Sequence, residues 1–245
     1  HINRLKGRLA FDSFTVEGYY EYERLLNLNR ELEPNNLYLD MDEAWFYMLG
    51  IWLGLSENIE KDTKEAHRLT LNVVKKDPEY AYASNLAAML ESQYLGDLDT
   101  ACRRLEKLEQ ISTDASNIEM TASRARNCGK YEKSLKLYAK ALKMAPHIGL
   151  SMNKAYAVTF LMKAFEENKT DFSDAKAFIK SQIKENYSGE GVNEMWLMML
   201  AYMSAKEGEQ NLALEYFSQQ AKMEIPITKK SIKNSNFVGK ENDVF

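Results

Sequence analysis

Residues that break or redirect a chain are scarce in this sequence. The 245 residues include 4 prolines and 11 glycines, too few for the tight turns of an all-β protein. Two cysteines cannot build a disulfide framework or a four-cysteine zinc site. The histidines, His1, His67 and His147, lie far apart, and none has the spacing of a helical metal-binding pair. We therefore expect no metal ion and no cofactor.

Charge of one sign and long apolar runs are also missing. The sequence has 32 Lys+Arg against 36 Asp+Glu, a net charge of −4, so it lacks the basic excess of a nucleic-acid-binding protein. The apolar runs 44–55 and 195–203 are shorter than the roughly 20 residues that cross a bilayer. No signal peptide is visible, and the first residue is His1 rather than Met, so we expect a piece of a longer protein. We expect a soluble segment without nucleic-acid partners or membrane insertion, in the cytoplasm or, alternatively, the periplasm.

Catalytic motifs are absent as well. There is no GxSxG, P-loop or GxGxxG sequence. The acidic cluster Asp40-Met-Asp42-Glu43 lies just ahead of a helical stretch, where carboxylates cap free amides and oppose the helix dipole. We therefore expect this segment not to be an enzyme and predict no catalytic residues.

A periodic placement of proline is present instead. Pro34, Pro78, Pro146 and Pro226 each follow a stretch with helical character. A proline just past a helix end prevents the helix from continuing. Pro78 and Pro146 are 68 residues apart, which is twice a period of about 34 residues. The spacing predicts repeated units that each end in a helix.

Glycines mark a second position in each unit. A glycine precedes a small residue by five positions at Gly96–Ala101, Gly129–Ser134 and Gly208–Ala213. The glycine suits a tight turn between paired helices, and the small residue lets the second helix approach the first. The clearest unit is 117–146, in which apolar and small residues recur at helical spacing: Tyr131, Ser134, Leu135, Tyr138, Ala141 and Leu142.

This unit resembles the tetratricopeptide repeat (TPR), and looser units of the same kind cover 3–34, 45–78, 82–113, 151–187 and 193–226. The resemblance implies an all-α fold, a right-handed α–α superhelix of about six degenerate helix pairs that share a continuous core. We expect this domain to span residues 1–226 and a polar tail to span 227–245.

The order of several short segments is similar to that found in a narrower group of proteins. In this group the segments belong to the C-terminal TPR region of bacterial class III adenylate cyclases and of membrane-spanning winged-helix transcription activators. The segments are Leu53–Asn58, Asp77-Pro78, Glu79–Ala83, Leu95–Ala101 and Leu142–His147. The resemblance implies a regulatory protein-interaction module, bound by a protein, a peptide or another domain of its parent, with any cyclase activity elsewhere in that parent. The alternative is a small-ligand sensor, which requires a closed, apolar pocket of several hundred Å³.

Two groups of residues are candidates for binding. The partner-binding candidates are those that the TPR pattern places on the inward face of the first helices: Tyr47, Ile51, Leu86, Leu90, Glu119, Ser123, Phe160, Met198 and Tyr202. TPR domains that bind chaperone tails hold a terminal carboxylate with Lys and Asn at such positions, which are absent here. A basic cluster is a candidate anion patch, with a solvated helix face as the alternative: Arg103, Arg104, Lys107, Arg124 and Arg126.

Aromatic residues and the two cysteines complete the predictions. We interpret the stripe that includes Trp45, Trp52 and Tyr82 as packing between helices, with some rings lining the groove where a partner would bind. Cys102 and Cys128 belong to neighbouring antiparallel helices of a TPR stack, so their thiols should be close. We expect both to be buried and reduced; the alternative is a disulfide, which requires Cα atoms within about 7 Å and indicates an oxidising compartment.

Overall fold

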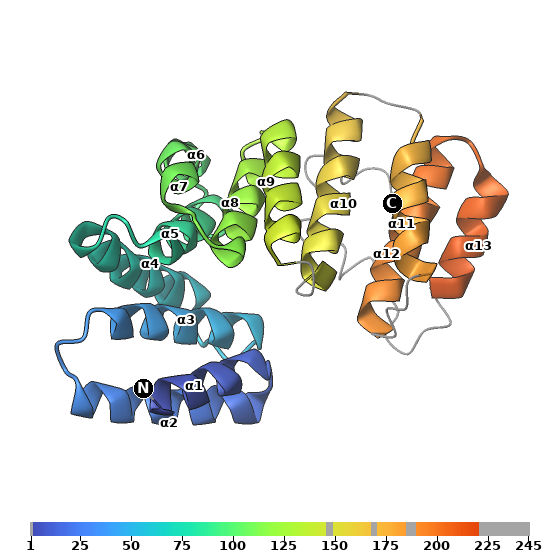
Figure 1. Cartoon of the computed structure of the whole chain (residues 1–245). Helices are drawn as coiled ribbons and strands as arrows, with labels where there is room; N and C mark the ends of the chain where they lie inside the picture. Colours follow the sequence, from blue (N-terminus) through green and yellow to red (C-terminus); the bar gives the residue numbers. More distant parts are fainter. Residues whose placement is uncertain (1, 146–148, 168–170, 185–189, 221–245) are drawn as a thin grey trace. The chain divides into compact units, whose positions relative to one another are not determined.

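A computed structural model describes residues 2–145, 149–167, 171–184 and 190–220, and every regular element within these ranges is a helix (Figure 1). The all-α prediction is confirmed. The chain divides into two compact units, 1–128 and 129–245, which we describe separately. Pro146, His147, Pro226 and the predicted tail 227–245 lie outside the described residues.

The first unit consists of helices that pack in consecutive pairs (Figure 1). Helix α1 packs on α2, α3 on α4, and α5 on α6, while α8 packs against α5 and α7. Their bounds are α1 (Ile2–Asp12), α2 (Val16–Leu32), α3 (Tyr38–Trp52), α4 (Ile59–Lys76), α5 (Ala81–Gln93), α6 (Leu98–Arg103), α7 (Leu105–Ile111) and α8 (Ala115–Asn127). Each pair buries an apolar face that neither helix could bury alone.

The second unit repeats this arrangement with α9 (Tyr131–Met144), α10 (Gly149–Glu166), α11 (Ser173–Lys184), α12 (Glu190–Lys206) and α13 (Gln210–Gln220). Helix α10 packs on α9 and α11, and α12 packs on α11 and α13. Trp196 belongs to the core of this unit and is 1% exposed. An ion-pair cluster ties α11 to the α12–α13 turn, because Lys176 donates to both Glu207 and Glu209.

The proline-marked helix ends are confirmed where the structure describes them. Helices α2, α4 and α9 each end two residues before a proline, Pro34, Pro78 and Pro146. The residue after each helix has nearly the same backbone angles: φ/ψ is −136°/65° at Glu33, −134°/80° at Asp77 and −140°/70° at Ala145. Each of these three residues directly precedes a proline. Because the proline ring disfavours helical backbone angles in the residue before it, each helix ends in the same way.

The turn glycines are confirmed as well. Gly96, Gly129 and Gly208 have φ of 70°, 68° and 81°. These angles lie in the left-handed region, which residues that carry a Cβ rarely adopt. The small residues that follow them, Ala101, Ser134 and Ala213, are buried, as close helix contact requires. The glycine marker thus identifies both the turn and the contact point of the next helix.

The second helix of the third pair differs from the sequence prediction. A TPR unit has two helices, whereas the second half of the unit 82–113 contains α6 and α7, which meet at Arg104. The Arg104 side chain leaves this junction to pair with Glu91 of α5, which is 2% exposed. Nε2 of His67, on α4, lies 3.0 Å from the same carboxylate. The buried carboxylate therefore has one ion-pair partner, Arg104, and a second polar contact from His67.

Candidate interaction surface

Six aromatic side chains in the first unit form a continuous series of ring contacts, which we call the aromatic track. Three of them, Tyr38, Trp45 and Trp52, are seven residues apart along α3 and therefore lie on one face of that helix. Tyr80 and Tyr82 come from the start of α5, and Phe14 comes from the turn between α1 and α2. Segments far apart in the sequence thus contribute rings to one surface.

The contacts run through the track without a break. From Phe14 to Trp52 the ring centroids are 6.0 Å apart, and from Trp52 to Trp45 they are 5.8 Å apart. The next steps, Trp45 to Tyr82, Tyr82 to Tyr80 and Tyr80 to Tyr38, measure 5.5, 6.1 and 5.2 Å. All five lie within the range in which aromatic pairs attract one another beyond their burial of area.

The track is anchored in the core at its middle and exposed at its two ends. Trp45 is 9% exposed and contacts the buried ring of Phe11 edge-on, at 5.7 Å. Phe14, Tyr38 and Trp52 are 51%, 38% and 37% exposed. Phe14 and Trp52 are exposed and in contact with each other. A folded protein seldom leaves adjacent large rings in contact with water, and such a surface is typical of a binding site.

Charged groups beside the track are paired with one another. Nε of Arg4 lies 3.0 Å from Oδ2 of Asp42, and Nε of Arg8 lies 3.1 Å from Oδ1 of Asp12. The guanidinium of Arg8 also lies 5.0 Å from the ring centroid of Phe11, within cation–π range. Burial raises the pKa of Asp42, although the hydrogen bond from Arg4 opposes this effect. Internal pairing therefore leaves little net charge for a ligand to satisfy.

Phenol and indole groups at the ring edges are held by hydrogen bonds. The hydroxyl of Tyr82 accepts a bond of 3.1 Å from Nη1 of Arg8, and the hydroxyl of Tyr94 accepts one of 2.8 Å from Nε1 of Trp52. The hydroxyl of Tyr38 donates to Asp77 at 3.0 Å. Burial raises the pKa of Tyr80 to about 12, so its phenol is neutral at physiological pH. The track thus presents neutral donors beside its rings.

The predicted inward-face residues fall into two groups. Leu86 and Leu90 are fully buried, and Met198 and Tyr202 are 7% and 9% exposed, so these four side chains pack in the cores rather than on an accessible surface. The partly exposed members are Tyr47, Ile51, Glu119, Ser123 and Phe160. Helix α5 is buried from Ala83 to Glu91, so no single face of it is the exposed one. Binding of a partner by the predicted residues stays a prediction.

The predicted anion patch is largely used by internal contacts. Arg104 is committed to Glu91, and Lys107 forms an ion pair with Glu79. Arg124 is only 7% exposed and donates to the carbonyl of Met120 at 3.3 Å. Arg103 and Arg126 donate to the hydroxyls of Thr100 and Ser123, respectively. The five cations therefore do not form one exposed basic surface.

The cysteines correct another expectation. Cys102, on α6, and Cys128, at the end of α8, form a disulfide with Cα atoms 5.7 Å apart. The predicted adjacency of the two helices is confirmed, whereas the expected reduced state is not what the structure shows. Both residues are partly exposed rather than buried in the core.

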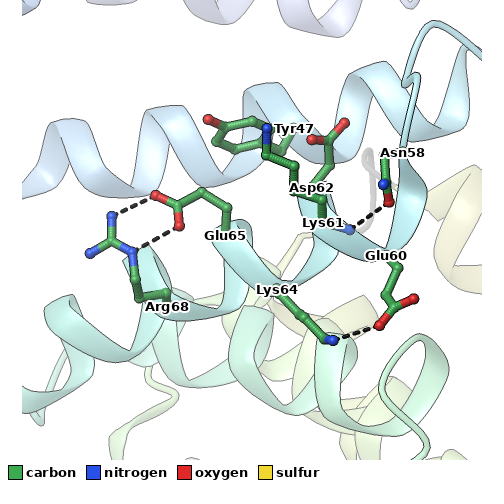
Figure 2. Close-up of a pocket in the computed structure, with 8 residues that line it drawn as sticks. All are labelled: Tyr47, Asn58, Glu60, Lys61, Asp62, Lys64, Glu65 and Arg68. Carbon is green, nitrogen blue, oxygen red and sulfur yellow. Dashed lines mark hydrogen bonds and ion pairs between the residues drawn. The ribbon is translucent and has the colours of Figure 1, made fainter.

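Surface hollows provide a second type of candidate site. One hollow of about 660 Å³ lies open along α4 and includes Tyr47 of α3 (Figure 2). Four of its charged side chains form two ion pairs, Arg68 with Glu65 at 2.6 Å and Lys64 with Glu60 at 2.5 Å. Another of about 470 Å³ is open beside Cys102, and an enclosed one beneath α1 has only about 50 Å³. None of these three has the closed, apolar volume that the sensor hypothesis requires.

Two kinds of feature are missing from the described residues. No helix there is both long and apolar enough to cross a membrane. Within the same ranges, no three residues among His, Cys, Asp and Glu are grouped so that they could hold a metal ion.

The paired helices, turn glycines and buried small residues define the TPR fold, and solved structures share it. The chain is similar to PilW, described as a widely conserved type IV pilus biogenesis factor, with 14% identity and a TM-score of 0.64 over 96% of this chain and 98% of PilW. It is also similar to a tetratricopeptide repeat protein from Parabacteroides merdae ATCC 43184, with 15% identity and a TM-score of 0.51 over 95% and 96% of the two chains. No family model and no curated protein matches the sequence.

Proposed function

We propose that this chain is a non-catalytic protein-interaction module that binds a polypeptide through the aromatic track. The TPR fold supports a protein-binding role in general. The observation that carries the particular proposal is the unbroken series of rings from Phe14 to Tyr38, whose exposed members cost free energy in water unless a partner covers them.

The track also satisfies the physical requirements of an interaction hot spot. Tryptophan and tyrosine contribute large contact areas at low cost in side-chain entropy, and they dominate the energetics of many interfaces. Trp45 is fixed by the core, and Nε1 of Trp52 is bonded to Tyr94, so both rings are positioned before a partner arrives. Such preorganisation reduces the entropic cost of binding.

We further infer that the module works in an oxidising compartment. The half-buried Cys102–Cys128 bond supports this location, because structural disulfides persist outside the reducing cytosol. The same location suits the extracytoplasmic part of a membrane-spanning regulator, one of the two parents that the sequence resemblance implies. A regulatory role within such a parent, or within an adenylate cyclase, stays a prediction from that resemblance.

Selection of peptides from a random library tests the interaction. Purified oxidised protein is used as bait, and each selected peptide is then titrated in solution against the wild type and the double variant Tyr38→Ala/Trp52→Ala. We expect selected peptides to bind the wild type and to lose at least about tenfold in affinity on the double variant.

Tyr20→Ala is the matched control. Tyr20 is 57% exposed on α2 and is not part of the track, so its loss should leave peptide binding unchanged. Failure to select any peptide, or equal binding by the double variant, would contradict the proposed function.

A further inference from the structure

We propose that the aromatic track binds an extended, proline-rich segment in the polyproline II conformation. This inference rests on the proposed function and specifies the class of partner. Three features of the track support it: its internally paired charges, its hydroxyl donors and the spacing of its rings.

The pairing of charges favours an uncharged ligand. Arg4 and Arg8 already contact Asp42 and Asp12, and Asp77 already accepts from Tyr38. A charged ligand would have to break these contacts and leave one partner of each pair uncompensated, which is unfavourable near a buried surface. Proline carries no charge, and its ring presents a flat apolar face that suits an aromatic ring.

The hydroxyl groups favour a ligand that offers hydrogen-bond acceptors. Tyr82 and Tyr94 each use the hydroxyl oxygen to accept a bond within the protein, and neither hydroxyl has an acceptor for its own proton among the described residues. Each can therefore donate to a ligand. A run of prolines has backbone carbonyls but no N–H, and the polyproline II helix leaves these carbonyls unpaired. An α-helical ligand, in contrast, uses its carbonyls internally.

The ring spacing fits the same conformation. The centroids of the two adjacent exposed rings, Phe14 and Trp52, are 6.0 Å apart. A polyproline II segment rises about 3.1 Å per residue, so two residues advance about 6 Å, close to one ring step. Aromatic-lined surfaces that bind proline-rich segments use this preformed ligand geometry, which costs little entropy on binding.

The test uses defined ligands and intrinsic tryptophan fluorescence, confirmed by calorimetry. The probes are decaproline, a Gly/Ser peptide of equal length, an alanine-rich helical peptide and a chitin oligosaccharide. We expect decaproline alone to bind, and we expect its affinity to fall by about tenfold or more in Trp52→Ala. Because Trp52 is itself a reporter, calorimetry measures binding to that variant.

Two further variants distinguish loss of a hydrogen bond to the ligand from loss of structure. Tyr82→Phe keeps the ring and removes the hydroxyl, and we expect it to weaken decaproline binding by about threefold to tenfold while circular dichroism stays unchanged. Tyr20→Ala should bind decaproline like the wild type. Equal affinities of Tyr82→Phe and the wild type would overturn the role of the hydroxyl donors.

The outcomes distinguish the inference from the proposed function. If decaproline does not bind but the helical or Gly/Ser peptide binds in a Trp52-dependent manner, the proline-rich partner is wrong and the peptide-binding role stands. If only the chitin oligosaccharide binds, both are wrong. Decaproline binding that Trp52→Ala leaves unchanged would overturn the assignment to the track.

Discussion

Arg104 donates two hydrogen bonds to Glu91, of 2.7 and 2.8 Å, and thereby joins the junction of α6 and α7 to the buried helix α5. The Glu91 side chain is 2% exposed and that of Arg104 is 23% exposed. The carboxylate is therefore shielded from water, whereas the guanidinium is partly solvated. The contact lies at the residue where the second helix of this pair is interrupted.

Removing the cation should destabilise the first unit strongly. Arg104→Met leaves a buried carboxylate with only His67 as a partner, and we expect a loss of about 3 kcal/mol, at the lower end for a broken buried ion pair because Arg104 is partly solvated. Urea unfolding followed by circular dichroism measures the change. Arg103→Met, on the exposed neighbour, should change the free energy of unfolding by about 0.5 kcal/mol or less. Equal effects of the two substitutions on the free energy of unfolding would show that the Arg104–Glu91 pair does not stabilise the first unit.

The same carboxylate should make stability depend on acid pH. Burial alone would raise the pKa of Glu91, but hydrogen bonds from His67 and Arg104 outweigh burial and hold its pKa below the usual range. A lowered folded-state pKa gives a stabilisation that is complete above the unfolded-state pKa of about 4.3 and disappears as the pH falls through the folded-state pKa. We expect the free-energy difference between the wild type and Glu91→Gln to shrink below about pH 4. Urea titrations across this range test it, and a difference that grows in acid would reverse the assigned sign.

A small residue at position 141 should be essential to the packing of α9. Ala141 is fully buried, whereas Ala139 on the same helix is exposed. Ala141→Leu should cost about 1–3 kcal/mol through overpacking. Ala139→Leu adds the same atoms at an exposed position, and we expect a change of about 0.5 kcal/mol or less. Thermal and urea unfolding distinguish the two, and an unchanged melting temperature for Ala141→Leu would contradict the repeat register.

The disulfide should be detectable and stabilising. Titration of thiols in denatured, non-reduced protein from its native compartment should find no free cysteine, because both are in the Cys102–Cys128 bond. Reduction should lower the free energy of unfolding by about 3 kcal/mol, as expected for a closed loop of this size. The variant Cys102→Ser/Cys128→Ser should be insensitive to reductant. Two free thiols in the native protein would refute the inferred compartment.

An acidic C-terminal peptide of the kind that chaperone-binding TPR domains hold should not bind. The expected Lys and Asn positions are occupied by other residues, and the arginines nearest the track are paired with Asp42 and Asp12. Calorimetric titration at low and high salt is the measurement. Tight binding that salt abolishes would show that Arg4 or Arg8 exchanges its internal partner for the peptide carboxylate.

Local chemistry made much of the fold predictable. Proline and glycine act on the backbone at their own positions, so they marked the ends of α2, α4 and α9 and the left-handed turns at Gly96, Gly129 and Gly208. The adjacency of Cys102 and Cys128 followed from the antiparallel order of paired helices. These inferences need only the repeat pattern and the antiparallel direction of its paired helices.

The binding surface was less predictable because it depends on contacts between helices. The heptad spacing of Tyr38, Trp45 and Trp52 indicates one face of α3, but their contact with Tyr80 and Tyr82 depends on how α5 is rotated against that face. Helix α5 is rich in small and apolar residues on every side, so its sequence does not indicate the rotation. For the same reason, the pairing of Arg104 with Glu91 could not be distinguished from an exposed basic cluster.

The disulfide also determines what a protease can do to the first unit. The bond encloses α7 and the exposed turn residues Thr113 and Asp114, a position typical of proteolytic cleavage. A cut at this turn breaks the polypeptide but leaves its two pieces covalently joined through Cys102 and Cys128. The nicked protein would therefore migrate as one species until a reductant separates it into two.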